Sequence, residues 1–504
     1  MKKILLIGAG SAGQKVAKEF KENKNYEIIG FMDSDKRKFW KKYEGISVIG
    51  DHKYLEEFLN SNEIDEILIT STDMSSKEKD KIYQVAKIFK VEVKHLPEIE
   101  ELKNEEEFSK QLQKLNIPLS VPNLSLDIVE NVRECVETGW VSTGGRFITE
   151  FEEKIAEYVG VKEAVGVQSG SAGLHIAYRV MGVETGDEVI CPTTTFIATV
   201  NPIMYIGALP VFMDCDDTLN MDLDKLEEFL NQKSEIKDLN GEEVTVNKES
   251  GRKIKAICIV HVFGNPIDMD RVIKIAKKYK LKVIEDSAES LGSYYIKDGE
   301  KIHTGTIGDI GIFSFNANKI LTTGGGGMVV AKDKEILDKV RFLSVQAKTD
   351  PLYFTHDEIG YNYRLTNVAA AFGVSQMKQL EEFVETKIKN YNLYKEAIKD
   401  IDGLEILPFN EGTRANHWFY SIMIDKDKFG IDRDELLVKL NECGIQSRPL
   451  WGLMHDQKPL KNYEAYKIEK ARYYVDNLLN IPCSSNLTEE QVEAVIGKLK
   501  EFKK

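Results

Sequence analysis

Residues 309–328 read DIGIFSFNANKILTTGGGGM. The apolar run from Ile310 to Phe315 predicts a buried strand, and a short polar patch follows it. Lys319 comes next, between Asn318 and a stretch of threonines and glycines with little side-chain bulk. A lysine just past a buried strand can reach a pocket, lose part of its solvation and form a Schiff base with a carbonyl cofactor. The alternative is a solvated surface charge, the commoner fate of a lysine.

The overall composition favours a large, acidic, globular protein. The 504-residue chain is 42% hydrophobic and 30% charged, with a formal net charge of -14. Its length predicts about three structural units. An acidic surface disfavours nucleic acid and anionic membranes, and no apolar run reaches the ~20 residues of a membrane span. The first apolar run is too short for a signal peptide, so we expect a cytoplasmic protein. Six scattered cysteines without a CxxC pair predict free thiols, with no disulfide framework and no metal site.

Strand-like and helix-like segments alternate in two separate regions. In residues 1–100, the runs KILLIG, YEIIGFM, DEILIT and VEVKHL alternate with amphipathic segments, which predicts a Rossmann-like parallel sheet. The charged residues 101–116 predict a linker helix. Residues 117–366 repeat the alternation and predict a larger parallel α/β domain, interrupted by a surface hairpin at 233–253. Residues 367–504 begin with a helical stretch and predict a smaller C-terminal α+β domain.

Glycines near the N-terminus have the spacing of a nucleotide-binding loop. Gly8, Gly10 and Gly13 lie between a predicted strand and a predicted helix. In a GxGxxG motif the first glycine allows the turn, the second lets backbone approach a pyrophosphate and the third lets helix pack on strand. Asp33 ends the second strand, where an acid can bind a ribose. The motif predicts NAD(P) or another nucleotide, and a domain that binds something else or only packs is the alternative.

This N-terminal region resembles a known domain. ILLIGAGSAGQKVAKEF, IIGFMDSD, ISVIG and VKHLPEIEEL are similar to the first nucleotide-binding domain of the CapD-like polysaccharide-biosynthesis dehydratases. In those proteins a second, catalytic dinucleotide domain follows, with a Tyr-xxx-Lys pair that does not follow here. The resemblance therefore implies a nucleotide-binding domain without redox chemistry of its own.

The larger region contains the other parts of a site for pyridoxal phosphate (PLP). Asp286 follows a predicted strand and can pair with the pyridine nitrogen, although it could simply cap the next segment. Ser171 and Ala172 lie at a predicted helix N-terminus, which is an anion site or an ordinary capped helix. Ser314 can add a hydroxyl, and Phe196 can stack on the cofactor ring or belong to the core. Because these residues lie near the carboxyl ends of predicted strands, the set favours PLP.

Residues 117–504 resemble the DegT/StrS family of PLP-dependent nucleotide-sugar aminotransferases over essentially their full length. The matching segments include SGSAGLHIA, IEDSAESLG, SFNANKILTTGGGG and GYNYRLTN, while HVFGNPIDMD and QAKTDPLYF are typical of the LegC-type members. The resemblance implies a fold-type I aminotransferase with Lys319 as the Schiff-base lysine and Asp286 as the partner of the pyridine nitrogen. The family's dehydratases carry histidine in place of this lysine, so Lys319 disfavours that branch.

The same resemblance implies roles for residues whose local pattern says little. Asn362 would reach the phosphate of the neighbouring subunit in a homodimer with shared sites, although a turn asparagine can also satisfy its own backbone. Glu289 would contact the cofactor in place of an amide or histidine common in relatives, and its role stays open. Ordinary surface ion pairs are the alternative for the two arginines among the implied substrate contacts. These contacts are Trp140, Ser142, Thr143, Arg146 and Arg448.

The implied reaction is a transamination. L-Glutamate would give its amino group to PLP, which would pass it to carbon 4 of a nucleotide-linked 4-keto-6-deoxy sugar. The LegC-type resemblance implies a UDP- or GDP-linked 2-acetamido sugar used in bacterial surface-glycan synthesis. Two alternatives are an NAD-dependent nucleotide-sugar oxidoreductase or dehydratase built on the N-terminal glycines, and a non-catalytic regulatory protein with a PLP fold.

Overall fold

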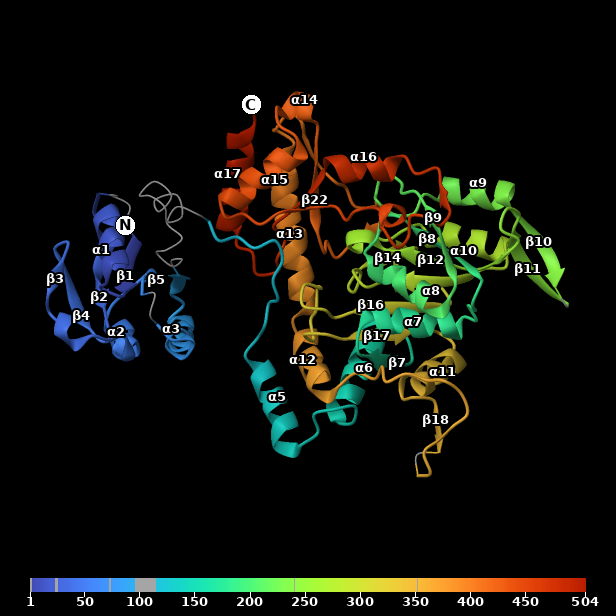
Figure 1. Ribbon diagram of the computed structural model, residues 1–504, viewed down its shortest axis with the longest axis horizontal. Coiled ribbons are helices and arrows are strands. Elements are labelled where there is room, and N and C mark those ends of the chain that lie inside the picture. The colour runs from blue at the N-terminus through green and yellow to red at the C-terminus, as the bar shows by residue number, and fades with distance from the viewer. Residues whose placement is uncertain (1, 23–25, 72–73, 96–114, 240, 351) are drawn as a thin grey trace. The chain divides into compact units, whose positions relative to one another are not determined.

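The computed structural model describes residues 2–22, 26–71, 74–95, 115–239, 241–350 and 352–504 (Figure 1). The chain divides into two compact units, Met1–Leu115 and Asn116–Lys504. The linker helix expected at 101–116 falls almost entirely outside the described residues. Among the helices of the described ranges, none combines the length and apolar character needed to cross a bilayer. All six cysteines are free thiols, and five of them are buried.

The N-terminal unit is a six-stranded sheet in the order β3-β4-β2-β1-β5-β6. Only the short pairing of β3 with β4 is antiparallel, and Gly45, with φ at +82°, makes the turn between them. This hairpin adds two strands to the four that the sequence predicts. The strands are β1 (Lys2–Ile7), β2 (Tyr26–Met32), β3 (Lys42–Tyr43), β4 (Ile46–Gly50), β5 (Glu66–Ile69) and β6 (Glu92–His95). The helices are α1 (Ser11–Glu22), α2 (Leu55–Ser61) and α3 (Ser76–Ile88).

A large sheet forms the centre of the second unit, with the path β24-β9-β8-β12-β13-β16-β17-β7. Its strands are β7 (Ala164–Val167), β8 (Glu188–Pro192), β9 (Leu209–Met213), β12 (Lys253–Val260), β13 (Lys282–Asp286), β16 (Ile310–Ser314), β17 (Gly327–Val330) and β24 (Ala465–Tyr466). The helices around it are α5 (Asp127–Thr138), α6 (Arg146–Val159), α7 (Gly170–Val180), α8 (Asn201–Ile206), α9 (Leu223–Lys233), α10 (Met269–Lys278) and α11 (Lys334–Ser344). The predicted hairpin insertion is confirmed as β10 (Ser234–Leu239) and β11 (Glu242–Asn247), which pair antiparallel.

Outside the hairpin insertion, strand β17 departs from the predicted parallel sheet, because it runs antiparallel to both β16 and β7. Parallel neighbours need a crossover connection, usually a helix. Only residues 315–326 separate β16 from β17, and they contain no helix. The chain therefore turns back on itself here, and the turn contains Lys319.

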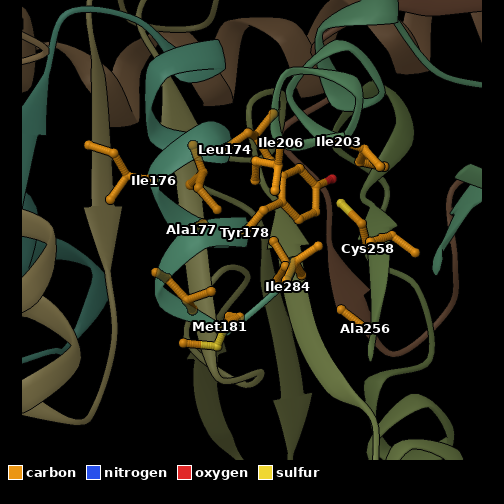
Figure 2. Packing of buried hydrophobic residues seen from close by; sticks show 14 of the residues in the cluster. Leu174, Ile176, Ala177, Tyr178, Met181, Ile203, Ile206, Ala256, Cys258 and Ile284 are labelled. Carbon is orange, nitrogen blue, oxygen red and sulfur yellow. The ribbon is translucent and has the colours of Figure 1, made fainter. Parts of the chain in front are cut away.

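Helix α7 packs closely on this sheet, as Figure 2 shows for its buried side chains. A Cβ atom on Gly173 would lie 2.9 Å from Cγ2 of Ile312, so only glycine allows the close approach of α7 to β16. Tyr178 is fully buried, and its hydroxyl donates a hydrogen bond to the carbonyl of Thr199, 3.0 Å away. This core contact fixes the segment that carries Thr199 and leads into α8.

The C-terminal part begins with the predicted helical stretch, α12 (Asn367–Met377) and α13 (Leu380–Ile398). An antiparallel sheet follows in the order β20-β22-β25-β23, built from Leu404–Ile406, Tyr420–Ile424, Leu478–Ile481 and Arg448–Pro449. The helices α14 (Lys426–Phe429), α15 (Arg433–Glu442), α16 (Lys470–Asn477) and α17 (Glu489–Phe502) complete it. Because β24 from this part joins the large sheet beside β9, the two parts share one compact unit. The boundary at 366/367 stays a prediction.

Candidate active site

A pocket of about 350 Å³ lies where β13 and β16 end and α7 begins. Six residues singled out in the sequence line it: Ser171, Phe196, Asp286, Glu289, Ser314 and Lys319. They come from segments spread over some 150 residues of sequence. Neighbouring parallel strands bring their carboxyl ends to one edge of the sheet, which is why these residues meet.

Lys319 points into this pocket from the turn between β16 and β17. Its Nζ lies 3.3 Å from Oε1 of Glu289 and 3.9 Å from the centre of the Trp418 ring. The side chain is only 13% exposed, so the solvated-lysine alternative does not apply. A Cβ on Gly327 would lie 2.8 Å from the backbone nitrogen of Gly170, so the glycines bring this turn against the start of α7.

Asp286 ends β13 with 3% of its surface exposed. Its Oδ2 accepts a hydrogen bond from the hydroxyl of Thr199 at 2.7 Å, and its Oδ1 accepts the backbone N–H of Ala288 at 3.1 Å. Burial raises the pKa of Asp286, and these two hydrogen bonds together with the charge of Lys319 oppose that rise. Thr199 was missed in the sequence, where it is one of several similar threonines in CPTTTFIATV.

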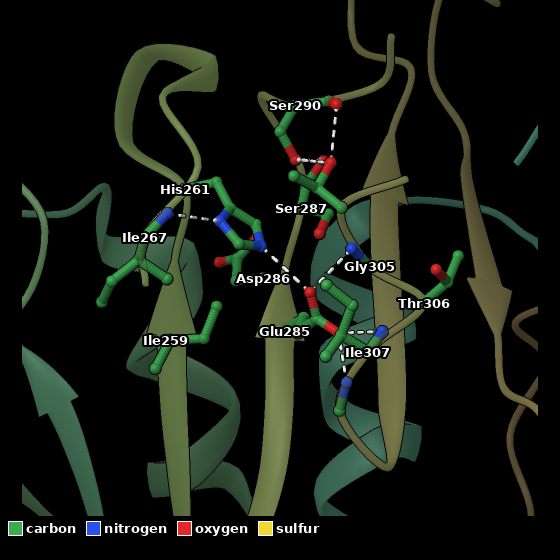
Figure 3. Close-up of polar contacts among 12 residues, drawn as sticks. Ile259, His261, Ile267, Glu285, Asp286, Ser287, Ser290, Gly305, Thr306 and Ile307 are labelled. Atoms are coloured by element: carbon green, nitrogen blue, oxygen red, sulfur yellow. Dashed lines mark hydrogen bonds and ion pairs between the residues drawn. The ribbon is translucent and has the colours of Figure 1, made fainter. Parts of the chain in front are cut away.

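Glu285 precedes Asp286 on β13, and successive side chains of a strand point to opposite faces of the sheet. Figure 3 shows the polar contacts of Glu285. Its carboxylate accepts backbone N–H groups from the 305–308 loop and lies 3.0 Å from Nε2 of His261. Nδ1 of His261 accepts the N–H of Ile267, so Nε2 carries the proton that is donated to Glu285. Glu285 on β13 thus connects the 305–308 loop, which precedes β16, with His261, which follows β12.

The start of α7 forms one end of the pocket. A Cβ on Gly170 would lie 2.9 Å from Cβ of Ser314, so glycine lets the helix N-terminus meet that serine. Ser171 lines the pocket. Ala172 is not among the lining residues, and its N–H donates to the N-cap hydroxyl of Ser169 at 3.1 Å. This is the contact of an ordinary capped helix, and a role of Ala172 in phosphate binding stays a prediction.

Phe196 lies in the pocket wall with 54% of its surface exposed, which rules out the alternative of a core phenylalanine. Three aromatic residues of the C-terminal part, Trp418, Phe419 and Trp451, also line the pocket and were missed in the sequence. NHWFY and RPLW carry the aromatic signal, but nothing local indicates which side chains turn toward the lysine.

The remaining candidates do not line the pocket of this chain, and their roles stay predictions. Trp140, Ser142, Thr143 and Arg146 are exposed around the segment before α6. Arg146 makes ion pairs with Glu134 and Glu150, which is the alternative that the sequence left open. Asn362 and Arg448 are exposed as well, and the guanidinium of Arg448 donates to the carbonyl of Ser447.

The glycines of the N-terminal unit open a second pocket, of about 380 Å³. Gly8 has φ at +110° and lines it together with Gly10 and Asp33. Gly13 instead packs against the strand, since a Cβ there would lie 2.0 Å from the carbonyl oxygen of Gly8.

Asp33 is engaged within the protein. Its Oδ2 accepts the N–H of Ala9 at 2.7 Å and binds Nζ of Lys38 at 2.8 Å. Burial alone would raise the pKa of Asp33, but the hydrogen bonds from Lys38, Asp35 and Ala9 lower it. His52 also lines this pocket, and its two ring nitrogens are buried without a hydrogen-bond partner in the described part of the chain. The GxGxxG pattern pointed to neither Lys38 nor His52.

A pocket with a lysine on a strand-ending turn, a buried aspartate and a helix N-terminus fits PLP, since each group has a cofactor atom to meet. The fold and this donor set define a PLP-dependent aminotransferase of fold type I. Residues 122–500 match the model of the DegT/DnrJ/EryC1/StrS aminotransferase family, and this chain belongs to that family. Residues 3–99 match the model of the PglD N-terminal domain, where the sequence resemblance was to CapD-like domains.

Similar proteins include several sugar aminotransferases. The chain is 37% identical to the putative PLP-dependent aminotransferase EpsN of Bacillus subtilis, over 76% of this chain and 95% of that protein. It is 34% identical to GDP-perosamine synthase of Caulobacter vibrioides, over 76% of this chain and 97% of that protein. Among solved structures, a family aminotransferase from Brucella abortus is 27% identical with a TM-score of 0.67, covering 75% of this chain and 95% of that one. Each of these alignments covers about three quarters of this chain, and the residues outside it are enough for the N-terminal unit.

Proposed function

We propose that this chain transfers the amino group of L-glutamate to carbon 4 of a nucleotide-linked 4-keto-6-deoxy sugar, in the synthesis of a bacterial surface glycan. The sugar would be a UDP- or GDP-linked 2-acetamido-4-keto-2,6-dideoxyhexose. The observation that carries the proposal is the placing of Lys319 beside Asp286 and Glu289 in one pocket. A Campylobacter jejuni relative, 30% identical over 69% of this chain and 87% of that protein, is a UDP-4-amino-4,6-dideoxy-N-acetyl-beta-L-altrosamine transaminase, which supports the choice of substrate.

Each residue of the pocket has a distinct task in this proposal. PLP, when bound, supplies the electron sink that lets an amine and a carbonyl exchange places. Lys319 would hold the cofactor through Nζ and, when its amine is free, would be the group that moves a proton in the pocket. Asp286 would pair with the ring nitrogen, and Phe196 would lie against the ring face. Ser171, Ser314 and the N-terminus of α7 would hold the phosphate.

Turnover with glutamate tests this function directly. We expect purified protein to convert at least one member of a panel of UDP- and GDP-linked 4-keto-6-deoxy sugars to its 4-amino form, detected by mass spectrometry. Lys319→Ala should lose both turnover and the visible absorbance of bound PLP, because Lys319 is the one lysine among the described residues that line the pocket. Lys500→Ala, which removes an exposed lysine of α17, should change neither. Normal turnover by Lys319→Ala would contradict the proposal.

We propose further that the enzyme is a homodimer whose sites are shared. Near Asn362, the side chains of Leu352, Tyr353, Phe354 and Ile359 are between 67% and 79% exposed. Clusters of large exposed apolar side chains are typical of protein interfaces. A two-fold dimer would pair such patches and let each subunit give one Asn362 loop and receive one.

For the N-terminal unit we propose a nucleotide ligand, NAD(P) or another, bound at the start of α1. Three features support this: the open space at Gly10, the α1 N-terminus and the buried His52. The ring nitrogens of His52 form no hydrogen bond with the described residues, and they lie 3.6 Å and 3.8 Å from carboxylate oxygens of Asp51 and Glu78. Calorimetry of the full chain with NAD, NADP, UDP and GDP should detect binding of at least one. Replacing His52 by phenylalanine should weaken it, whereas Tyr54→Phe, at an exposed neighbouring position, should not. No binding by any of the four would contradict this assignment.

A further inference from the structure

A closed ring of contacts surrounds the amine of Lys319. Nζ meets Oε1 of Glu289 at 3.3 Å, and Oε2 of the same carboxylate accepts the N–H of Phe263 at 2.9 Å. The carbonyl of Phe263 accepts the N–H of Trp418 at 3.1 Å, and the ring of Trp418 returns to Nζ at 3.9 Å. The side chain of Trp418 also donates through Nε1 to the carbonyl of Asn318, 2.7 Å away. The amine is thus held between a carboxylate and an aromatic face.

The backbone at Phe263 is strained in the conformation that makes these contacts. Phe263 has φ at +56° and ψ at 20°, a left-handed conformation that a residue with a Cβ adopts only at a cost in free energy. The next residue, Gly264, also has positive φ, and a Cβ there would lie 1.8 Å from Oδ1 of Asn416. Asn416 in turn donates to the backbone carbonyl of Glu289 at 2.8 Å. In this turn Phe263 donates its N–H to Glu289 and accepts the N–H of Trp418 with its carbonyl.

Glu289 is the only carboxylate that forms a hydrogen bond with the amine in the described pocket. Its side chain is 5% exposed, and burial raises the pKa of Glu289 while the charge of Lys319 opposes the rise. One oxygen is committed to a backbone N–H, which does not give up its proton, so only Oε1 can exchange one. Asp286 lines the same pocket, but in the described residues its hydrogen bonds come from Thr199 and Ala288 and not from Lys319.

We propose that Glu289 is a positioning residue for Lys319 that holds the lysine as an ammonium ion against the Trp418 ring and accepts its proton. The proton moves from Nζ to Oε1, breaking one N–H bond and forming one O–H bond. The products are a neutral amine, ready to bond to a carbonyl carbon, and a neutral carboxyl group. The proton returns when the lysine is released. The proposal rests on the function above only in taking Lys319 as the lysine that bonds to the cofactor.

Chemical labelling of cofactor-free protein tests this without turnover. Brief treatment with acetic anhydride at pH 7 modifies only neutral amines, and mass spectrometry reports acetylation of Lys319 relative to the exposed Lys500. Glu289→Gln keeps the size of the side chain and an oxygen for the N–H of Phe263, but it removes the charge. An opposite charge at this distance changes a proton equilibrium by roughly tenfold to a thousandfold. We therefore expect Lys319 to be acetylated at least about ten times faster in Glu289→Gln than in the unaltered protein.

Glu442→Gln, which changes an exposed carboxylate of α15, should leave the rate unchanged. Equal rates in the Glu289→Gln and unaltered proteins, with the same thermal unfolding midpoint, would overturn the proposal. Labelling needs neither sugar nor glutamate, so a failure of the proposed substrate assignment would not alter this result.

A second pair of variants keeps the test decisive if Glu289→Gln does not fold. Trp418→Phe and Trp418→Leu both lose the indole N–H, but only the leucine loses the aromatic face that stabilises a cation. Lys319 should be acetylated several-fold faster in Trp418→Leu than in Trp418→Phe. Equal rates in these two variants would show that the amine is not held as a cation against the ring, and the proposal would fall.

Discussion

At the scale of single residues, the site depends on hydrogen bonds that fix the charge of buried groups. Asp286 is buried, which favours its neutral form, whereas its proposed pairing with a protonated ring nitrogen requires the anionic form. Thr199 supplies the hydrogen bond that opposes the effect of burial most strongly. The core tyrosine Tyr178 holds Thr199 in place through its carbonyl. A hydroxyl two residues before α8 therefore opposes the rise that burial causes in the pKa of an aspartate 87 residues further along the chain.

Replacing Thr199 by valine should shift the pH dependence of the enzyme. Without the hydroxyl, the pKa of Asp286 rises further, so a higher pH is needed to keep the carboxylate ionised. The acid limb of the kcat/KM profile should move to higher pH, and the loss of a hydrogen bond to a charged group should cost about 1.5–3 kcal/mol of stability. Thr195→Val removes the neighbouring hydroxyl, which bonds to Thr199 and not to Asp286, and should leave the limb in place. An unchanged limb in Thr199→Val would contradict the role of this contact.

At the scale of elements, the pocket is shaped by how closely α7 and the turn after β16 approach each other. Gly170 and Gly173 allow α7 to touch Ser314 and Ile312, and Gly327 allows the returning strand to reach the start of α7. The reversal at β17 places a short, glycine-rich turn at the sheet edge where β13 also ends. Lys319 lies on that turn, which explains why small residues follow it.

Gly170→Ala should therefore destabilise the protein and weaken PLP binding. The added Cβ would lie 2.9 Å from Cβ of Ser314, and overpacking of this kind costs typically about 1–3 kcal/mol. Urea unfolding and the PLP dissociation constant measure the two effects. Gly497→Ala is the matched control, because this helical glycine of α17 has open space around it. There the same substitution should stabilise by about 0.4–1 kcal/mol. A stable Gly170→Ala variant with normal PLP affinity would show that the close approach is not required.

At the scale of the whole molecule, an aminotransferase unit is joined to a separate N-terminal unit with its own sheet and its own pocket. Residues Asn116–Lys504 contain every residue that lines the candidate active site. The core clusters of the two units share no residue.

A shortened chain beginning near residue 112 should keep aminotransferase activity. It retains the complete large sheet, the C-terminal part and every residue that lines the candidate active site. PLP binding and kcat should therefore stay within about a factor of two of the values for the full chain, because kcat depends on contacts made in the transition state. Visible absorbance and turnover measure these quantities. Loss of activity in a folded, PLP-loaded shortened chain would instead show that the N-terminal unit takes part in catalysis or substrate delivery.

Mixed dimers test the proposed sharing of sites. Lys319→Ala and Asn362→Asp should each be inactive or badly impaired alone, the second because a carboxylate would face the phosphate. In a mixed dimer one site carries both changes and the other carries neither. Activity should therefore reappear in isolated mixed dimers that carry different affinity tags. Mixed dimers as inactive as their parents would place Asn362 outside the partner's site.

The alternation of strands and helices in both units could be predicted from the sequence alone, apart from the short β3–β4 hairpin, and so could the lysine, aspartate and serines of the pocket. Period-two and helical patterns are local, and the ends of parallel strands meet by the geometry of the sheet itself, so Lys319, Asp286 and Ser314 could be grouped before any contact was known. The direction of β17 could have been found the same way, from the short connection before it.

Only the tertiary structure decided what holds those groups. Trp418 reaches Lys319 from about 100 residues away, Thr199 reaches Asp286 across 87 residues, and Glu289 depends on the strained turn at Phe263. The N–H of Ala172 is occupied by Ser169, and Arg146 by two surface glutamates. Such contacts follow from packing between distant segments, and the propensity of a local stretch contains no information about which distant partner it will meet.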